Sequence, residues 1–191
     1  MTKTERPAGE GPTDKGAAPP RRRRVLIAVV AFVFAVVIAT DQLTKNWATA
    51  NLEHQPPIPI IDGWVSLLFY RNGGAAFGMG AGATWLFAVV AAAVVVVIVV
   101  TARKLGSTGW AISFGLLLAG AGGNLTDRLF RQPGFGEGKV VDFINLHFFI
   151  CNVADIAITA GAVLFILLSF MGIGLDGTRA SARRREESGD A

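Results

Sequence analysis

Hydrophobic residues in this chain are concentrated in four long runs, which are separated by segments rich in polar, basic and glycine residues. The runs cover residues 25–40, 83–101, about 108–123 and about 153–175. As an α-helix the second run is about 28 Å long, which is enough to cross a hydrocarbon core. Its valines would favour a strand in water, but in lipid one continuous segment satisfies its backbone only as a helix. The pattern predicts an all-α membrane protein with four transmembrane helices.

A shorter pattern interrupts this series between the first two runs. Residues 58–61 and 64–70 are apolar and β-prone, and Asp62-Gly63 separates them. Asp-Gly between two such segments is a hairpin signal. We therefore expect a small extracytoplasmic β-sheet region on the outer membrane surface, with an irregular loop carrying aromatic anchors as the alternative.

Composition and charge support the membrane assignment. Hydrophobic residues make up 52% of the chain, more than a soluble fold of 191 residues can hide in uninterrupted runs. Basic residues cluster at 21–24, 103–104 and 183–185, all on one side of four spans. The positive-inside rule makes that side cytoplasmic, so both termini lie inside and segments 41–82 and 124–152 lie outside. The basic residues therefore indicate topology and lipid head groups, and we expect no nucleic-acid partner.

The chain divides into one membrane domain and two tails. Residues 1–24 and 176–191 are predicted to be disordered cytoplasmic tails, and residues 25–175 form the domain. Arginines 21–24, the first apolar run and Ala48-Thr49-Ala50 together imitate a cleavable secretory signal. Asp41 and Lys45 lie between that run and the imitated cleavage site, which argues against cleavage.

Polar residues gather at the predicted outer ends of the helices, where ionisable groups near hydrocarbon are costly and usually functional. Asp142 lies within Val-Val-Asp-Phe-Ile, and Asp155 lies about one turn into the fourth run. Two carboxylates that approach each other cannot both ionise easily, so such a pair offers an acid and a base that can activate water against a peptide bond. A structural carboxylate near a helix N-terminus is the alternative for Asp155.

Other polar residues also have simple structural explanations. Asp41 and Lys45 could form an exposed i,i+4 ion pair, worth about 0.3–0.5 kcal/mol. Asp127 and Arg128 could mark the membrane interface.

The remaining candidates are expected to serve packing. Gly115, Ala119 and Gly123 repeat every four residues, a spacing that lets membrane helices approach closely. Cys151 is flanked by apolar residues and has no histidine placed to activate it, so it is predicted to be a small buried hydrophobe.

Several chemistries are excluded by what the sequence lacks. One cysteine allows neither an internal disulfide nor a thiolate zinc site, and His54 and His147 are not in metal-ligand spacing. There is no His-Glu-x-x-His, no Gly-x-Ser-x-Gly and no Walker loop. Aspartate chemistry remains, with neither metal nor cofactor expected.

Two functions of other classes remain as alternatives. A small transporter or channel with a proton relay would need polar residues in mid-helix, and residues 91–100 and 162–168 contain none. A metal-dependent phosphotransferase acting on membrane lipids would need densely spaced aspartates and would lose activity in a chelator.

Five sequence blocks together resemble signal peptidase II, the lipoprotein signal peptidase family, over nearly all of residues 25–175. Ala119 stands where a glycine is usual and Cys151 where a phenylalanine is usual, and neither departure removes a polar group. The blocks, in order, are Asp41-x-x-Thr44-Lys45, Asn72-x-Gly74-Ala75-Ala76-Phe77, Gly120-Ala121-x-Gly123-Asn124-x-x-Asp127-Arg128, Val141-Asp142-Phe143 and Asn152-x-Ala154-Asp155.

The resemblance implies an aspartic endopeptidase of the bacterial inner membrane with its active site at the outer face. We expect it to be a monomer whose partners are its substrate and membrane lipids. Its implied substrate is a prolipoprotein whose cysteine carries diacylglycerol, cut N-terminal to that cysteine. Asp142 and Asp155 correspond to the catalytic pair. The supporting residues implied by the family are Asp41, Lys45, Asn72, Asn124, Asp127, Arg128 and Asn152.

Overall fold

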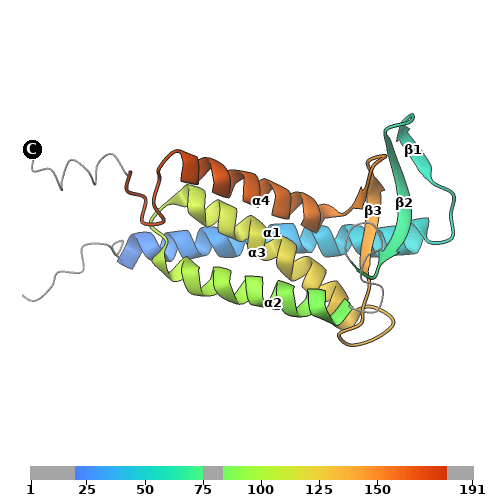
Figure 1. The fold of residues 1–191 in the computed structure, drawn as a ribbon, viewed down its shortest axis with the longest axis horizontal. Coiled ribbons are helices and arrows are strands. Elements are labelled where there is room, and N and C mark those ends of the chain that lie inside the picture. The colour runs from blue at the N-terminus through green and yellow to red at the C-terminus, as the bar shows by residue number, and fades with distance from the viewer. Residues whose placement is uncertain (1–19, 75–83, 180–191) are drawn as a thin grey trace, which may run out of the picture.

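Four long helices run side by side in alternating directions, and a small sheet lies across one end of the bundle (Figure 1). This computed structural model describes residues 20–74 and 84–179. The helices are α1 (Pro20–Leu52), α2 (Thr84–Thr101), α3 (Thr108–Phe130) and α4 (Val153–Phe170), with a short 3-10 turn, η2 (Ala102–Lys104), after α2. The antiparallel strands are β1 (Ile58–Ile61), β2 (Val65–Asn72), β3 (Val140–Asn145) and β4 (Ile150–Cys151), paired in that order.

Helix α3 lies in the middle of the bundle and contacts each of the other three helices. Small residues allow this close packing, as their spacing predicted. A Cβ on Gly115 would lie 2.8 Å from Cβ of Val33 in α1, and a Cβ on Gly120 would lie 2.5 Å from the carbonyl oxygen of Ala154 in α4. Ala119 on the same helix is completely buried.

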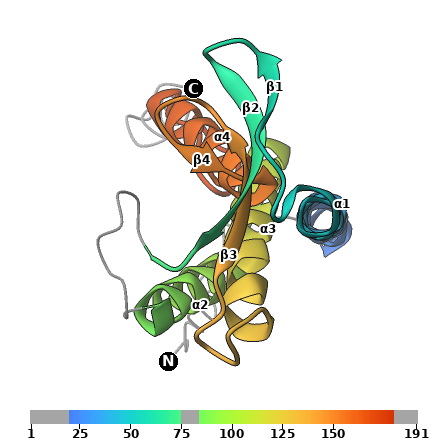
Figure 2. The same cartoon turned by 90° about the vertical axis from the view of Figure 1, so that its right-hand side faces the viewer.

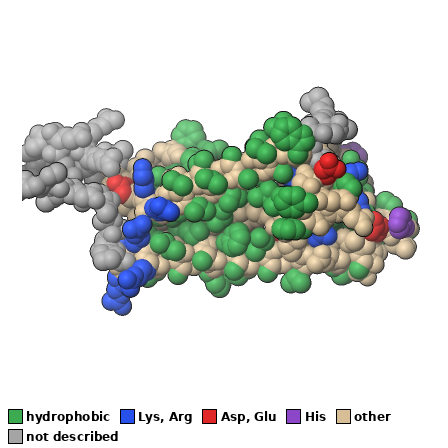
Figure 3. Space-filling model, turned by 90° about the horizontal axis from the view of Figure 1, so that it is seen from below, with side chains coloured by type: hydrophobic (Ala, Val, Ile, Leu, Met, Phe, Trp, Pro, Cys, Tyr) green, Lys and Arg blue, Asp and Glu red, His purple; other side chains and the backbone are tan. Residues whose placement is uncertain are grey.

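Three helices, α1, α2 and α4, are long and apolar enough to cross a membrane, so the chain is a multi-pass membrane protein. Large apolar side chains such as Val96 and Val97 are exposed on α2, and the flank of the bundle is largely hydrophobic (Figure 3). The predicted fourth span, α3, is not among the three because glycines and a polar C-terminal end lower its hydropathy.

Two helices extend beyond their apolar runs. Arginines 21–24 were expected in a disordered tail, but α1 begins at Pro20 and includes them. The same helix continues to Leu52, because Ala48 and Leu52 pack against Val141 and Phe143 of β3. Helix α3 likewise continues past residue 123 to Phe130.

The chain after α4 folds back on the bundle instead of extending the helix to residue 175. Gly172 adopts a φ of +65°, which turns the chain. Ile173 then pairs with Arg179, and the indole N–H of Trp110 donates to the Ile173 carbonyl at 3.0 Å. Residues 176–179 of the expected tail are therefore ordered, and the rest of both tails lies outside the described residues.

The predicted hairpin is present as β1 and β2. Gly63 has a φ of +75° in the turn, and the Trp64 N–H donates to the Ile61 carbonyl at 3.0 Å. The strands β3 and β4 were not predicted. They complete the sheet, which crosses in front of α3 and α4 when the bundle is viewed along its axis (Figure 2).

The pairing of β2 with β3 changes register by one residue within the strands. Leu67 pairs with Ile144, but Tyr70 pairs with Asp142. Two residues of β2, at 68 and 69, therefore oppose the single residue 143 of β3, which is a β-bulge. Beyond the bulge, Tyr70 and Asp142 share one face of the sheet.

Candidate active site

Asp142 and Asp155 come from different elements and are linked through one asparagine. Asp142 lies in β3, Asp155 lies in the first turn of α4, and Asn152 caps that helix. The Asn152 amide Nδ2 donates to Oδ1 of Asp142, and its backbone N–H donates to Oδ2 of Asp155 at 3.2 Å. The predicted meeting of these segments across a short connection is therefore present in the structure.

The other two carboxylate oxygens also accept amide donors. Asn72 Nδ2, from the end of β2, donates to Asp142 Oδ2 at 2.9 Å. Asn124 Nδ2, from α3, donates to Asp155 Oδ1 at 2.8 Å. Neutral amides thus orient both carboxylates and stabilise their charged forms without placing a positive charge directly against them.

The two aspartates differ in their surroundings. The Asp142 residue is only 1% exposed, whereas Asp155 is partly exposed. Burial, with a further contribution from the Asp155 charge, raises the pKa of Asp142 to about 6 against the opposing hydrogen bonds from Asn72 and Asn152. A carboxyl with a pKa near the working pH can both hold and release a proton, as acid–base chemistry requires.

Asp155 also has the structural role that was the alternative to a catalytic one. Its backbone N–H donates to Oδ1 of Asn152 at 3.0 Å while its Oδ2 accepts from the Asn152 N–H, so the two residues form a capping box. The cap uses one carboxylate oxygen, and Oδ1 is directed to Asn124. Capping therefore orients Asp155 toward the site.

Asp41, Lys45 and Asp127 form a buried charge cluster. Lys45 Nζ lies 2.9 Å from an oxygen of each aspartate and donates to Asn124 Oδ1 at 3.0 Å, which uses all three of its N–H groups. All three charged residues are 0% exposed. The interpretations of Asp41–Lys45 as an exposed ion pair and of Asp127 as an interface marker are therefore wrong.

Arg128 lies beside the site, and some of its guanidinium N–H groups have no hydrogen-bond partner in the described part of the chain. Its Nη1 donates to the Asn124 carbonyl at 3.3 Å, and its guanidinium lies 5.7 Å from the centre of the Phe87 ring in α2. Its Nε is buried without a hydrogen-bond partner among the described residues, and Arg128 forms no ion pair there. A guanidinium N–H of this kind can donate a hydrogen bond to a carbonyl oxygen of a bound peptide.

Two residues of the cluster were missed by sequence reasoning. Gln42 Nε2 donates to Asp41 Oδ2 and to Asp127 Oδ1, each at 3.1 Å. Arg131 Nε donates to Asp127 Oδ1 at 2.7 Å. The four-residue spacing from Asp127 to Arg131 is an ion-pair signal on a helix, but the helix was expected to end at residue 123.

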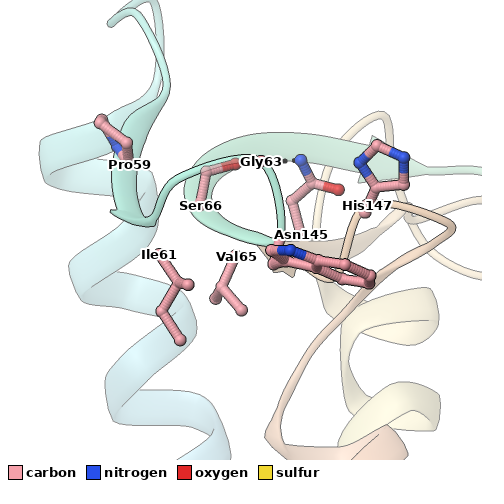
Figure 4. A pocket seen from close by; sticks show the side chains of 8 residues that line it. Pro59, Ile61, Gly63, Val65, Ser66, Asn145 and His147 are labelled. Carbon is pink, nitrogen blue, oxygen red and sulfur yellow. Dashed lines mark hydrogen bonds between the residues drawn. The ribbon is translucent and has the colours of Figure 1, made fainter.

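Other features near the sheet stand apart from the aspartate pair. Burial, followed by the two nearby aspartates, raises the pKa of Cys151 to about 11, so this buried thiol stays protonated. Within residues 20–74 and 84–179, no group of three or more His, Cys, Asp or Glu side chains is arranged to hold a metal ion. A hollow of about 170 Å³ lies between the two hairpin turns (Figure 4), lined by Pro59, Ile61, Gly63, Trp64, Val65, Ser66, Asn145 and His147.

The fold and the site define a multi-pass membrane protein with an amide-held pair of carboxylates at one end of its helices. The profile of the Signal peptidase (SPase) II family matches residues 33–171. The chain therefore belongs to the signal peptidase II family and is a peptidase, which confirms the resemblance of the five sequence blocks.

Individual relatives agree over most of their length. The lipoprotein signal peptidase of Streptomyces coelicolor is 48% identical over 83% of this chain and 76% of its own. That of Mycobacterium avium is 41% identical over 97% and 99%, respectively. A solved structure described as a bacterial membrane enzyme is 27% identical, with a TM-score of 0.65 over 75% of this chain and 88% of that one.

Proposed function

We propose that this protein removes the signal peptide from prolipoproteins whose cysteine carries diacylglycerol, cutting N-terminal to that cysteine with Asp142 and Asp155 as the catalytic pair. The observation that carries the proposal is the joining of these two carboxylates through Asn152 in a member of a peptidase family. The site needs neither metal nor cofactor for this chemistry.

The two environments suggest a division of roles. Asp142, whose pKa of about 6 favours the proton more than an ordinary carboxyl does, is the acid that donates to the scissile carbonyl oxygen. Asp155, which is partly exposed, is the base that takes a proton from water as the water oxygen bonds to the carbonyl carbon. When the tetrahedral intermediate collapses, the C–N bond breaks, Asp155 gives its proton to the leaving amine of the cysteine, and Asp142 takes a proton back from a hydroxyl of the intermediate, which restores both carboxyls.

The surrounding residues are proposed to hold the pair and the substrate backbone. Asn72, Asn124 and Asn152 fix the carboxylates through their amides. Arg128 offers N–H groups to the peptide on the α2 side. Asp41, Lys45 and Asp127 support them from within the bundle.

Charge distribution supports the orientation in the membrane. Arginines 21–24 in α1, together with Arg103 and Lys104 after α2, are exposed at the end of the bundle opposite the sheet (Figures 1 and 3). The positive-inside rule makes that end cytoplasmic and the aspartate end external. Helix α3 has 23 residues, about 34 Å of helix, and runs antiparallel to α2 and α4, so we include it as a fourth span.

The lipid on the substrate explains how a bond reaches this site. A signal peptide is itself a membrane helix, and each buried acyl CH₂ contributes about 0.8 kcal/mol to anchoring the cysteine at the membrane boundary. Trp64, which is 65% exposed near the turn of the hairpin, and the exposed Ile61 provide apolar cover at that depth. The acyl chains thereby hold the scissile bond at the level of the two carboxylates, and positioning of that kind lowers a barrier.

The test compares a diacylglyceryl-modified precursor with its unmodified form, using the purified full chain in detergent. We expect mass spectrometry to show cleavage directly before the modified cysteine and little or no cleavage of the unmodified precursor. Asp142→Asn and Asp155→Asn should each abolish cleavage while the protein still folds. A chelator should change nothing, because carboxylates activate the water.

A matched control neutralises another carboxylate at the same end of the bundle. Glu53 forms a partly exposed ion pair with Arg71 at 3.0 Å, so Glu53→Gln should retain turnover. Equal cleavage of modified and unmodified precursors would refute the lipid requirement. Near-normal turnover in either aspartate variant would refute the catalytic pair.

A further inference from the structure

Two carboxylates of the buried charge cluster accept hydrogen bonds from the backbone of the two segments that carry the aspartate pair. Asp41 Oδ1 accepts from the N–H of Ala154 in α4 at 2.9 Å. Asp127 Oδ2 accepts from the N–H of Val141 in β3 at 3.2 Å. Each amide belongs to the residue immediately before one aspartate of the pair, and Lys45 joins the two gripping carboxylates.

We propose that Asp41, Gln42, Lys45, Asp127 and Arg131 form a clamp that sets the separation of the two catalytic carboxylates, and that Arg131 is a positioning residue without which the clamp opens. This inference rests on the proposed function, since it assigns a purpose to the spacing of that pair. Arg131 lies outside the five sequence blocks that carry the family resemblance.

Charge balance explains why the clamp needs Arg131. Asp41 and Asp127 are completely buried, and Lys45 neutralises only one of their two negative charges. Arg131, whose side chain is 17% exposed, reaches in from the boundary and supplies the second positive charge at 2.7 Å. Buried charges are tolerated when they are paired, so the cluster is neutral only with Arg131 included.

Gln42 connects the two halves of the clamp. Its Nε2 reaches both gripping aspartates, and its Oε1 accepts from Nη2 of Arg131 at 3.4 Å. Gly123 leaves the room that this arrangement needs, because a Cβ there would lie 2.6 Å from Asp41 Oδ2. Removing the Arg131 charge leaves a buried negative charge at Asp127 without its second counter-charge, which weakens the hold of Asp127 on the backbone of β3.

A clamp that spaces the carboxylates affects the chemical step more than substrate binding. The substrate is held by its own membrane helix and acyl chains, which do not contact Arg131 in the proposed arrangement. A misplacement of about 1 Å between reacting groups lowers a rate by roughly 100-fold. Opening the clamp should therefore lower kcat and leave KM nearly unchanged.

The experiment compares three variants of the full chain on the diacylglyceryl-modified precursor, with kcat, KM and Tm measured for each. Arg131→Gln should lower kcat by about 10- to 100-fold with KM within about twofold of wild type. Arg131→Lys keeps one positive charge for Asp127 and should recover most of the lost kcat.

The matched control is Ser113→Ala. Ser113 Oγ donates to the carbonyl of Gly161 at 2.9 Å, a buried bond between α3 and α4 that lies about 16 Å along α3 from Asn124. It should lower Tm without lowering kcat at a temperature where the protein is folded. If Arg131→Gln behaves like Ser113→Ala, or if its loss is confined to KM, the clamp is wrong.

Failure of the clamp and failure of the proposed function give different results. An inactive Asp142→Asn variant beside a fully active Arg131→Gln variant would reject the clamp and leave the catalytic pair in place. An active Asp142→Asn variant would reject the pair itself.

Discussion

The buried carboxyl of Asp142 makes folding less favourable as the pH rises, and Asp142→Asn removes that dependence. Its pKa is raised from 3.8 in an ordinary aspartate to about 6 in the folded protein. Between those values the folded state binds more protons than the unfolded state. Below about pH 4 this group therefore has no effect on the stability of the wild type. Between about pH 4 and pH 6 it lowers that stability progressively, and above about pH 6 its destabilising effect is complete.

The size of the effect follows from the shift. A displacement of about two pKa units at 1.36 kcal/mol each corresponds to about 3 kcal/mol. The asparagine variant gains this amount relative to wild type between pH 4 and pH 7. It also loses one acceptor for the amides of Asn72 and Asn152, which costs about 1–3 kcal/mol at every pH because a buried donor is left unpaired. The sign of the stability difference between variant and wild type at any single pH is therefore less informative than the change of that difference between pH 4 and pH 7.

The assay is unfolding of both proteins in one nonionic detergent, followed by tryptophan fluorescence at several values from pH 4 to pH 8. The free-energy difference, variant minus wild type, should rise by about 3 kcal/mol across the range and level off above about pH 7. Glu53→Gln controls for the loss of one negative charge at the same end of the bundle. A difference that stays flat from pH 4 to pH 8 would refute the reasoning that burial holds a proton on Asp142.

Three further outcomes are expected. Gly120→Ala should lower Tm because the added Cβ would lie 2.5 Å from the backbone of α4. Gly122→Ala should leave Tm unchanged or slightly raised, because its Cβ would lie 3.4 Å from the nearest side chain, and equal Tm values for the two variants would contradict the close packing of α3. Arg128→Ala should lower kcat/KM by at least about tenfold while Tm changes little, since this side chain forms no ion pair among the described residues; unchanged kinetics would make the arginine an interfacial anchor. Reporter fusions should read external near Asp62 and cytoplasmic near Lys104, and an external signal at Lys104 would overturn the four-span topology.

The sequence predicted best the elements that depend on local pattern alone. Helix α2 begins one residue from the expected position and ends where expected, because an uninterrupted apolar run defines it. The hairpin was predicted from Asp62-Gly63, a local turn signal. By contrast, β3 was not predicted as a strand, because its central partner β2 lies about seventy residues earlier and the six residues of β3 carry no turn signal of their own.

The sequence supplied the residues of the candidate site, but it did not indicate how they connect. The approach of Asp142 and Asp155 followed from their closeness in sequence. The contact of Lys45 with Asp127 joins α1 to α3 across a long separation, and no local pattern indicates it. For the same reason Lys45 was interpreted only as the ion-pair partner of Asp41, which is its nearest acidic residue in the sequence, and Arg131 was not considered.

The bulge in β2 determines what kind of group stands next to Asp142. If the register at Leu67 and Ile144 continued without the extra residue, Phe69 would oppose Asp142, and Arg71 would follow it on the same face. A guanidinium there would strongly favour the ionised carboxyl and lower its pKa. The extra residue changes the parity of the strand and brings the neutral amide of Asn72 to that face instead. Deleting one residue from 68–69 would remove the bulge and still leave Tyr70 opposite Asp142 and Asn72 on its face, whereas a strand that kept every residue and paired without the bulge would place the cation there.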